Sequence, residues 1–295
     1  MPNYKIYADA TADIPEKLQK RYSIHTLGIP VAVGDHSFIS GENLNNEEFY
    51  RLLEESEAMP VTSQITPYQF YELFKAEWNE GTEELLVFLL NSKGSATYAN
   101  AVSSRKQLFE KHPEAEEKIR IHIFDGASYS FGFGYTAILA AQKLEMGMPA
   151  EEVCTLAQNQ LDKQSVLFGM YTLKFAGKSG RIPGAAVFVG ETLGIKPIMR
   201  IFDHKIVTAG KARGEKKLVR EVVKMVKAEM QPGTPYCLGY GSDLEAREEM
   251  REEATKKIGY PPLYDFQVGP AIAINAGHRV VGIVYEAKED GECTL

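Results

Sequence analysis

The first half of the chain alternates short apolar runs with amphipathic segments. Leu85 to Leu90 contains only apolar residues, which is typical of a strand buried on both faces of a parallel sheet. The same alternation predicts strands at 4–9 and 119–125, and helices at about 15–22, 97–110 and 130–146. Strands and helices in this order predict a parallel sheet with helices on both faces, a three-layer α/β/α domain.

The pattern changes after about residue 150. Helices are expected at 150–164, 214–230 and 244–258, and strands at 166–172, 197–202, 206–209, 235–240, 270–275 and 280–285. The second half therefore predicts a two-layer α/β domain with a mixed sheet. We place the two domains at residues 1–155 and 156–295. Residues 25–66 form an excursion from the first domain, with a helix at about 46–57 and another starting at Thr66-Pro67.

Composition restricts the class of protein. No run reaches 18 apolar residues, so no transmembrane segment is expected, and no apolar signal-peptide region follows Met1. The three cysteines lie far apart along the chain and are expected to be reduced, which favours a cytoplasmic location. A net charge of −7 argues against binding to nucleic acid or to an anionic membrane surface.

The motifs of common enzymes are missing. Gly177-Lys178-Ser179 resembles the end of a phosphate-binding loop, but Thr172 stands where that loop needs a glycine. The histidines show no metal-ligand spacing, and there is no Gly-x-Ser-x-Gly segment. We therefore predict no catalytic residue, no metal and no cofactor. Asp9 and Asp13 could form an acid/base pair, but a cap of the following helix explains Asp13 more simply.

Hydroxyl side chains gather in loops that lead into predicted helices. They are Thr62, Ser63, Ser92, Ser95, Thr97, Ser128 and Ser130. Each alone is most simply a helix cap. However, loops that follow parallel strands converge at one edge of the sheet, and hydroxyls with free backbone N–H groups can cradle an anion there. Because this set includes no arginine or lysine, it suits one carboxylate better than a phosphate chain.

Seven segments in order make the chain resemble the DegV family, the fatty-acid-binding subunits of bacterial fatty acid kinase. The resemblance covers nearly the whole chain and rests on Asp9 to Pro15, Pro60 to Gln64, Ser92 to Tyr98, Asp125 to Gly134, Gly177 to Ile182, Ile195 to Ile198 and Lys211 to Gly214. Ala10 stands where the family has serine, and Gly94 and Ala96 also depart from its pattern. The largest departure is Asn275 in place of a family histidine, since asparagine cannot carry charge.

The resemblance implies a long-chain fatty acid as ligand, enclosed in an apolar tunnel. It implies that Thr62 and Ser95 hold the carboxylate, with Ser63, Thr97 and Asn275 as further ligand-binding candidates. It also implies that Arg181 and Arg213 face an ATP-dependent kinase subunit that phosphorylates the bound acid. From the residues alone, either arginine could instead form an ordinary surface ion pair.

A second hypothesis stays open at this stage. The family's fold is similar to dihydroxyacetone kinase domains, so the chain could be an enzyme acting on a small hydroxylated or phosphorylated substrate. The failed phosphate-binding loop and the absence of metal-ligand spacing count against it.

Overall fold

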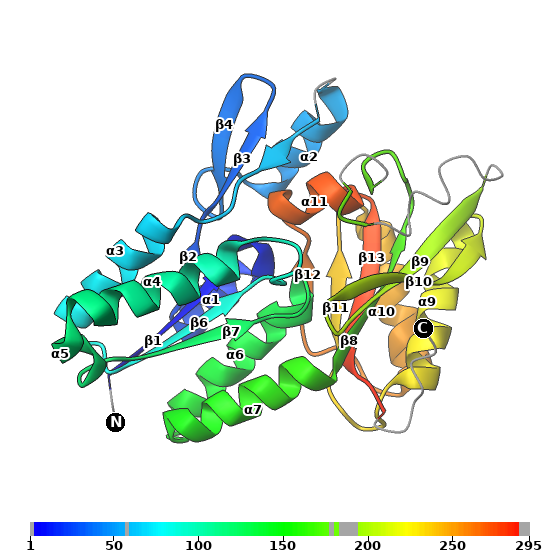
Figure 1. The fold of residues 1–295 in the computed structure, drawn as a ribbon. Coiled ribbons are helices and arrows are strands. Elements are labelled where there is room, and N and C mark those ends of the chain that lie inside the picture. The colour runs from blue at the N-terminus through cyan, green and yellow to red at the C-terminus, as the bar shows by residue number, and fades with distance from the viewer. Residues whose placement is uncertain (1–2, 57–58, 177–179, 183–193, 289–295) are drawn as a thin grey trace.

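The computed structural model describes residues 3–56, 59–176, 180–182 and 194–288. A four-stranded parallel sheet in the order β2-β1-β6-β7 forms the first unit (Figure 1). Its strands are β1 (Tyr4–Asp9), β2 (Ile24–Leu27), β6 (Glu84–Leu89) and β7 (Arg120–Asp125). Strands predicted at 4–9, 85–90 and 119–125 are therefore confirmed, and β2, inside the predicted excursion, adds an edge strand.

Helices cover both faces of this sheet. On one face lie α3 (Pro67–Asn79) and α4 (Thr97–Lys111), and on the other α1 (Glu16–Tyr22) and α6 (Phe131–Glu145). Every residue of β6 is buried, with Leu85, Val87 and Leu89 in one core cluster and Leu86 and Phe88 in the other. This two-sided burial is the reason for its continuous apolar sequence.

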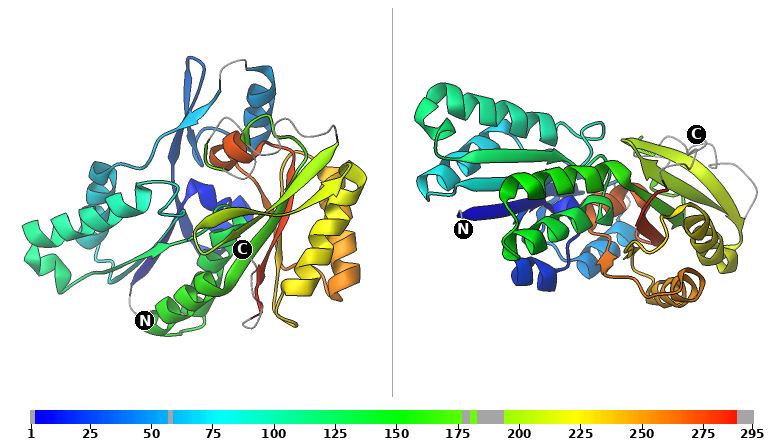
Figure 2. Two further views of the ribbon diagram at one scale, coloured as in Figure 1. Left: turned by 45° about the vertical axis from the view of Figure 1, so that its right-hand side comes forward. Right: turned by 90° about the horizontal axis from the view of Figure 1, so that it is seen from below.

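A smaller antiparallel sheet projects from the first unit. It consists of β3 (Ile29–Val33), β4 (His36–Ser40) and β5 (Val61–Thr62) in the order β4-β3-β5, with α2 (Asn46–Glu55) beside it. Two contacts tie α2 to the end of the chain. Tyr50 donates a hydrogen bond to the carbonyl of Val268, and His278 Nε2 lies 3.0 Å from Glu54 Oε1. The projecting sheet is thereby held over the edge where the β1 and β6 strands end (Figure 2).

A six-stranded mixed sheet in the order β10-β9-β8-β13-β11-β12 forms the second unit. Its strands are β8 (Gln164–Met170), β9 (Ile195–Phe202), β10 (Lys205–Arg213), β11 (Cys237–Tyr240), β12 (Asp265–Gln267) and β13 (Val280–Glu286). The β11–β12 pair is parallel and the other pairs are antiparallel. Helices α9 (Glu215–Glu229) and α10 (Leu244–Ile258) cover one face, as predicted.

The opposite face of the mixed sheet shares a core with the first unit. Phe168 and Ile201 from the mixed sheet belong to the same buried cluster as Phe131 of α6 and Phe88 of β6. Among the described residues, the remaining helices are a 3₁₀ turn (Ala10–Ala12), α5 (Pro113–Glu116), α7 (Ala150–Lys163) and α11 (Pro270–Ala276). The predicted domain boundary after residue 155 lies inside α7 and stays a prediction.

One predicted strand is wrong. Residues 270–275 form helix α11 instead of a strand, beginning with Pro270 at the first helical position after Gly269. The alternation of Ala and Ile in this segment was interpreted as a strand. In the helix four of these residues, Ala271, Ala273, Ile274 and Ala276, are buried, and they lie on all sides of it. This helix lies at the junction of the two units (Figure 1).

Candidate functional site

A polar cavity of about 550 Å³ lies where the loops after β1, β6 and β7 meet the projecting sheet and α11. Its lining is Thr11, Ile29, Thr62, Ser63, Gln64, Leu90, Gly94, Ser95, Ala96, Tyr129, Arg181, Ala271, Ile272 and Asn275. The carboxyl ends of parallel strands meet at this edge, so loops far apart in sequence share one space. Four of the five expected ligand-binding residues line it: Thr62, Ser63, Ser95 and Asn275.

Thr97, the fifth expected residue, stands behind Ser95. It is fully buried and does not line the cavity. The hydroxyl oxygens of Ser95 and Thr97 are 2.9 Å apart, and the Thr97 N–H donates to Ser95 Oγ at 3.2 Å. Thr97 therefore fixes the rotamer of Ser95 at the start of α4.

Asn275 has an incomplete hydrogen-bond set. Its Nδ2 donates to the carbonyl of Ala271 at 3.3 Å, one turn earlier in α11. Its Oδ1 is buried and has no hydrogen-bond partner among the described residues. Because a buried polar atom without a partner costs free energy, Oδ1 is suited to accept from a donor, whereas a carboxylate needs the amide turned so that Nδ2 faces it.

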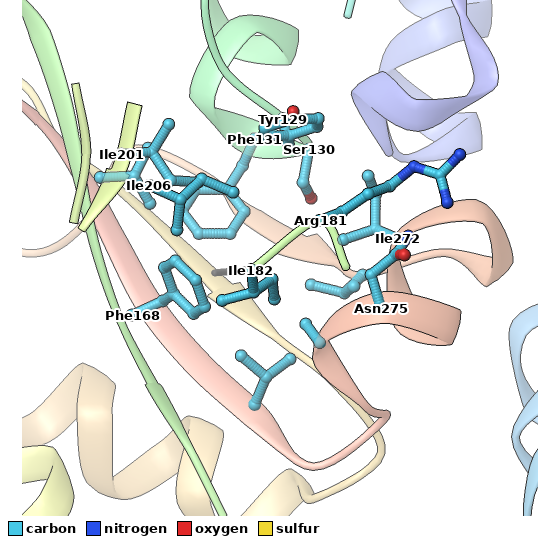
Figure 3. Close-up of a pocket in the computed structure, with 14 residues that line it drawn as sticks. Tyr129, Ser130, Phe131, Phe168, Arg181, Ile182, Ile201, Ile206, Ile272 and Asn275 are labelled. Carbon is cyan, nitrogen blue, oxygen red and sulfur yellow. The ribbon is translucent and has the colours of Figure 1, made fainter. Parts of the chain in front are cut away.

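An apolar cavity of about 60 Å³ lies beside the polar one. It is lined by Phe131, Val166, Phe168, Ile182, Ile201, Ile206, Val268, Ala276 and Val280, together with Ser130. Four lining residues are common to both cavities: Tyr129, Arg181, Ile272 and Asn275. Figure 3 shows Arg181 and Asn275 at one end of this pocket and Phe168, Ile201 and Ile206 at the other. The two cavities therefore lie next to each other, one lined by polar groups and the other by apolar side chains.

The two arginines expected at a partner surface lie in different places. Arg181 is exposed, yet its side chain lines both cavities. Arg213 is the exposed last residue of β10, where it pairs with Ile195, and it lines neither cavity. Arg181 is the only Lys, Arg or His among the described residues that line the polar cavity.

Tyr129 was missed in the sequence, as were Thr11 and Ile272. Burial raises the pKa of Tyr129, and the cation of Arg181 acts in the opposite direction, so the two groups are close enough to interact. A Cβ at Gly94 would lie 2.0 Å from Tyr129 Oη. Gly94, one of the departures from the family pattern, thus leaves room for the tyrosine. In the sequence, the signal for this contact was a glycine in a loop that is otherwise rich in hydroxyl side chains.

A third, acidic cavity of about 670 Å³ lies on the other side of the 3₁₀ turn. Its carboxylates are Asp9, Asp13, Glu16, Glu47 and Asp265. Burial raises the pKa of Asp9 to about 6 and that of Asp13 to about 8. The interpretation of Asp13 as a helix cap is wrong, because the residue before α1 is Pro15 and no side chain caps that helix. Asp13 instead accepts hydrogen bonds from the Ser130 hydroxyl and the Gly269 N–H.

The described residues contain no group of three or more His, Cys, Asp or Glu side chains that could hold a metal ion. Within the same residues, every helix is too short or too polar to cross a bilayer.

A family model described as "Uncharacterised protein, DegV family" matches residues 3–288. The chain belongs to the DegV family. A DegV domain-containing protein of Caldanaerobacter subterraneus is 27% identical over an alignment of 296 positions, which covers 98% of this chain and 100% of that relative. The resemblance found in the sequence is therefore confirmed.

Solved structures of the family share the fold. A DegV family protein from Thermus thermophilus, described as binding fatty acid, is 25% identical with a TM-score of 0.84, over 97% of this chain and 100% of that one. A DegV family protein from Eubacterium eligens, loaded with heptadecanoic acid, is 18% identical with a TM-score of 0.83, over 97% and 100% of the two chains. The predicted α/β fold with a parallel and a mixed sheet is confirmed.

Proposed function

We propose that this DegV family protein binds a long-chain fatty acid. Its carboxylate lies in the polar cavity, near Thr62, Ser95 and Asn275, and its tail enters the apolar cavity. The observation that carries the proposal is the shared wall of Tyr129, Arg181, Ile272 and Asn275, which joins a polar space to an apolar one. The fatty acids named for relatives of the same fold support it.

Burial of the tail supplies most of the affinity in this proposal. A 16-carbon acid has about 14 methylenes, and at roughly 0.8 kcal/mol each their full burial would contribute on the order of 11 kcal/mol before the costs of binding. The apolar cavity of about 60 Å³ must widen to take the whole tail. The hydroxyls of Thr62 and Ser95 then orient the head group. Thr97 positions Ser95, and exposed Ser63 lies at the rim.

The proposal gives this chain no catalytic residue. The bound acid is presented to a separate ATP-dependent kinase subunit in the cytoplasm, and that subunit forms the acyl phosphate. Arg213, outside both cavities, is proposed to contact only the kinase, whereas Arg181 also borders the ligand. A single cation among the described lining residues suits one carboxylate, which disfavours the alternative of a phosphorylated substrate.

The test is mass spectrometry of an organic extract of the purified protein, followed by titration of the delipidated protein with a fluorescent long-chain fatty acid. We expect a co-purifying fatty acid and saturable one-site binding. Protein that carries no fatty acid and takes up none would overturn the proposal.

A further inference from the structure

Asp9 lies at the end of β1 and its side chain is buried, with 1% of the residue exposed. Its Oδ1 accepts hydrogen bonds from the Thr11 N–H at 2.9 Å and from the Thr11 hydroxyl at 2.5 Å. Its Oδ2 accepts from the Leu90 N–H at 2.6 Å. All three contacts bring a hydrogen to the carboxyl group, so they match its ionised form.

Asp9 lies between the acidic cavity, which it lines, and the polar cavity, which it does not line. Its side chain borders the acidic cavity, whereas Thr11 and Leu90 border the polar one. Leu90 starts the loop that carries Ser95, and Thr11 belongs to the 3₁₀ turn between the cavities. One buried carboxylate thereby holds two walls of the polar cavity in place.

The contact also determines what the Thr11 hydroxyl can offer a ligand. A hydroxyl has one hydrogen, and Thr11 uses it for Asp9 Oδ1. Thr11 can then only accept from a group in the polar cavity. When Asp9 is protonated, its own hydrogen can be donated to Thr11 Oγ1, and the hydroxyl of Thr11 is free to donate in turn.

We infer that Asp9 is a positioning residue for the head group, acting through Thr11 from outside the cavity. Ionised Asp9 keeps Thr11 an acceptor and places a negative charge behind the wall, which opposes a carboxylate. Neutral Asp9 lets Thr11 donate to that carboxylate and removes the charge. This inference rests on the proposed fatty-acid function and adds to it a control of head-group affinity by one buried carboxyl group.

Other charged groups surround this one. Asp13, Glu16, Glu47 and Asp265 share the acidic cavity with Asp9, and Tyr240 lies there too. On the ligand side, Tyr129 and Arg181 line the polar cavity. Only Asp9 is hydrogen-bonded to Thr11 in the described structure, so the effect of the other groups should not depend on the Thr11 hydroxyl.

The test compares wild type, Thr11→Val, Thr11→Ser and Glu16→Gln. Fluorescence titration with a long-chain fatty acid is done from pH 8 to pH 5.5. Over this range the carboxyl group of the free fatty acid stays mostly ionised. Wild type and Thr11→Ser should gain about tenfold in affinity as pH falls through about 6, the pKa of Asp9, since one pK unit of coupling equals tenfold. Thr11→Val keeps the shape but not the hydroxyl and should lose most of this gain. Glu16→Gln removes an acidic-cavity charge away from Thr11 and should keep it.

Hexadecanol serves as a probe with an uncharged head group, and its affinity should change less than threefold over the same pH range. A wild type that binds no fatty acid at any pH would overturn the proposed function itself. A wild type that binds, with the same pH profile in Thr11→Val, would overturn only the inference that Asp9 acts through Thr11. Thr11→Ser that behaves like Thr11→Val would overturn it as well, because the hydroxyl would then not be the mediator.

Discussion

The polar and acidic cavities lie on opposite sides of one short turn and have opposite chemistry. Their volumes are similar, about 550 and 670 Å³. Among the described lining residues, the polar cavity contains no Asp or Glu, whereas the acidic cavity contains five and no Lys, Arg or His. An anionic head group is therefore attracted to one space and repelled from the other. Charge, and not volume, distinguishes the proposed ligand site from its neighbour.

The strongest test of this difference removes the hydroxyls from the polar cavity. Thr62→Ala combined with Ser95→Ala should weaken fatty-acid binding by about 3–6 kcal/mol, because two hydrogen bonds to a charged group are lost. Fluorescent fatty-acid titration measures the change, and the thermal unfolding midpoint checks the fold. Ser92→Ala is the matched control, since Ser92 lies in the same loop but lines neither cavity. Unchanged affinity in the double variant would place the head group elsewhere.

In the acidic cavity, stability should depend on Asp13. Its folded pKa of about 8 lies far above the usual 3.8, so the folded state keeps a proton that the unfolded state releases. The contribution of Asp13 to stability is largest below about pH 4 and is lost as pH rises toward 8, by up to about 1.4 kcal/mol per pH unit. From pH 6 to pH 8, urea unfolding of wild type should lose about 2 kcal/mol more than unfolding of Asp13→Asn.

The control for this measurement is Asp35→Asn, at an exposed turn. It should lose stability over that pH range in parallel with wild type. Parallel curves for wild type and Asp13→Asn would mean that Asp13 is not protonated in the folded protein.

A larger residue at position 94 should reduce the volume of the polar cavity, because Gly94 lines it. In Gly94→Ala the new methyl group meets Tyr129 Oη at 2.0 Å, so the tyrosine must move. We expect fatty-acid affinity to fall by about 1–3 kcal/mol, the usual cost of overpacking. Adding Tyr129→Phe should restore part of it, because the nearest atom is then gone. Calorimetric titration measures both, and an unaltered Gly94→Ala affinity would show that the tyrosine does not shape the site.

The smallest effect is expected at the arginines. Arg181→Gln should weaken fatty-acid binding by about 0.5–1.5 kcal/mol, since an exposed cation near a carboxylate contributes little. Arg213→Gln should leave this affinity unchanged and lower only acyl-phosphate formation by the proposed kinase partner. Exposed Arg220→Gln on α9 is the control for both assays. If the Arg213 and Arg181 variants lost equal fatty-acid affinity, the proposal that only Arg181 borders the ligand would be contradicted.

Much of the fold could be predicted because local patterns and the final packing agree. The apolar run of β6 is sandwiched between helices, and the α10 boundaries match the predicted 244–258. The loops with Ser95 and Ser130 were expected at one edge, since parallel strands end together. For these elements, the regular spacing of apolar residues was enough to predict a helix or a strand.

Other features depend on neighbours that are distant in sequence. The Ala and Ile alternation of residues 270–275 suits a strand as well as a helix, and packing on all sides of α11 decides for the helix. Asp13 looked like a cap until the fold brought Ser130 and Gly269 to its carboxylate. Arg181 looked like a surface residue, yet the junction of two sheets makes it part of both cavities. Local pattern determined most of the strands and helices. Contacts between remote segments decided that α11 is a helix and which polar groups line the proposed ligand site, because hydrogen-bond partners and burial exist only once the chain is folded.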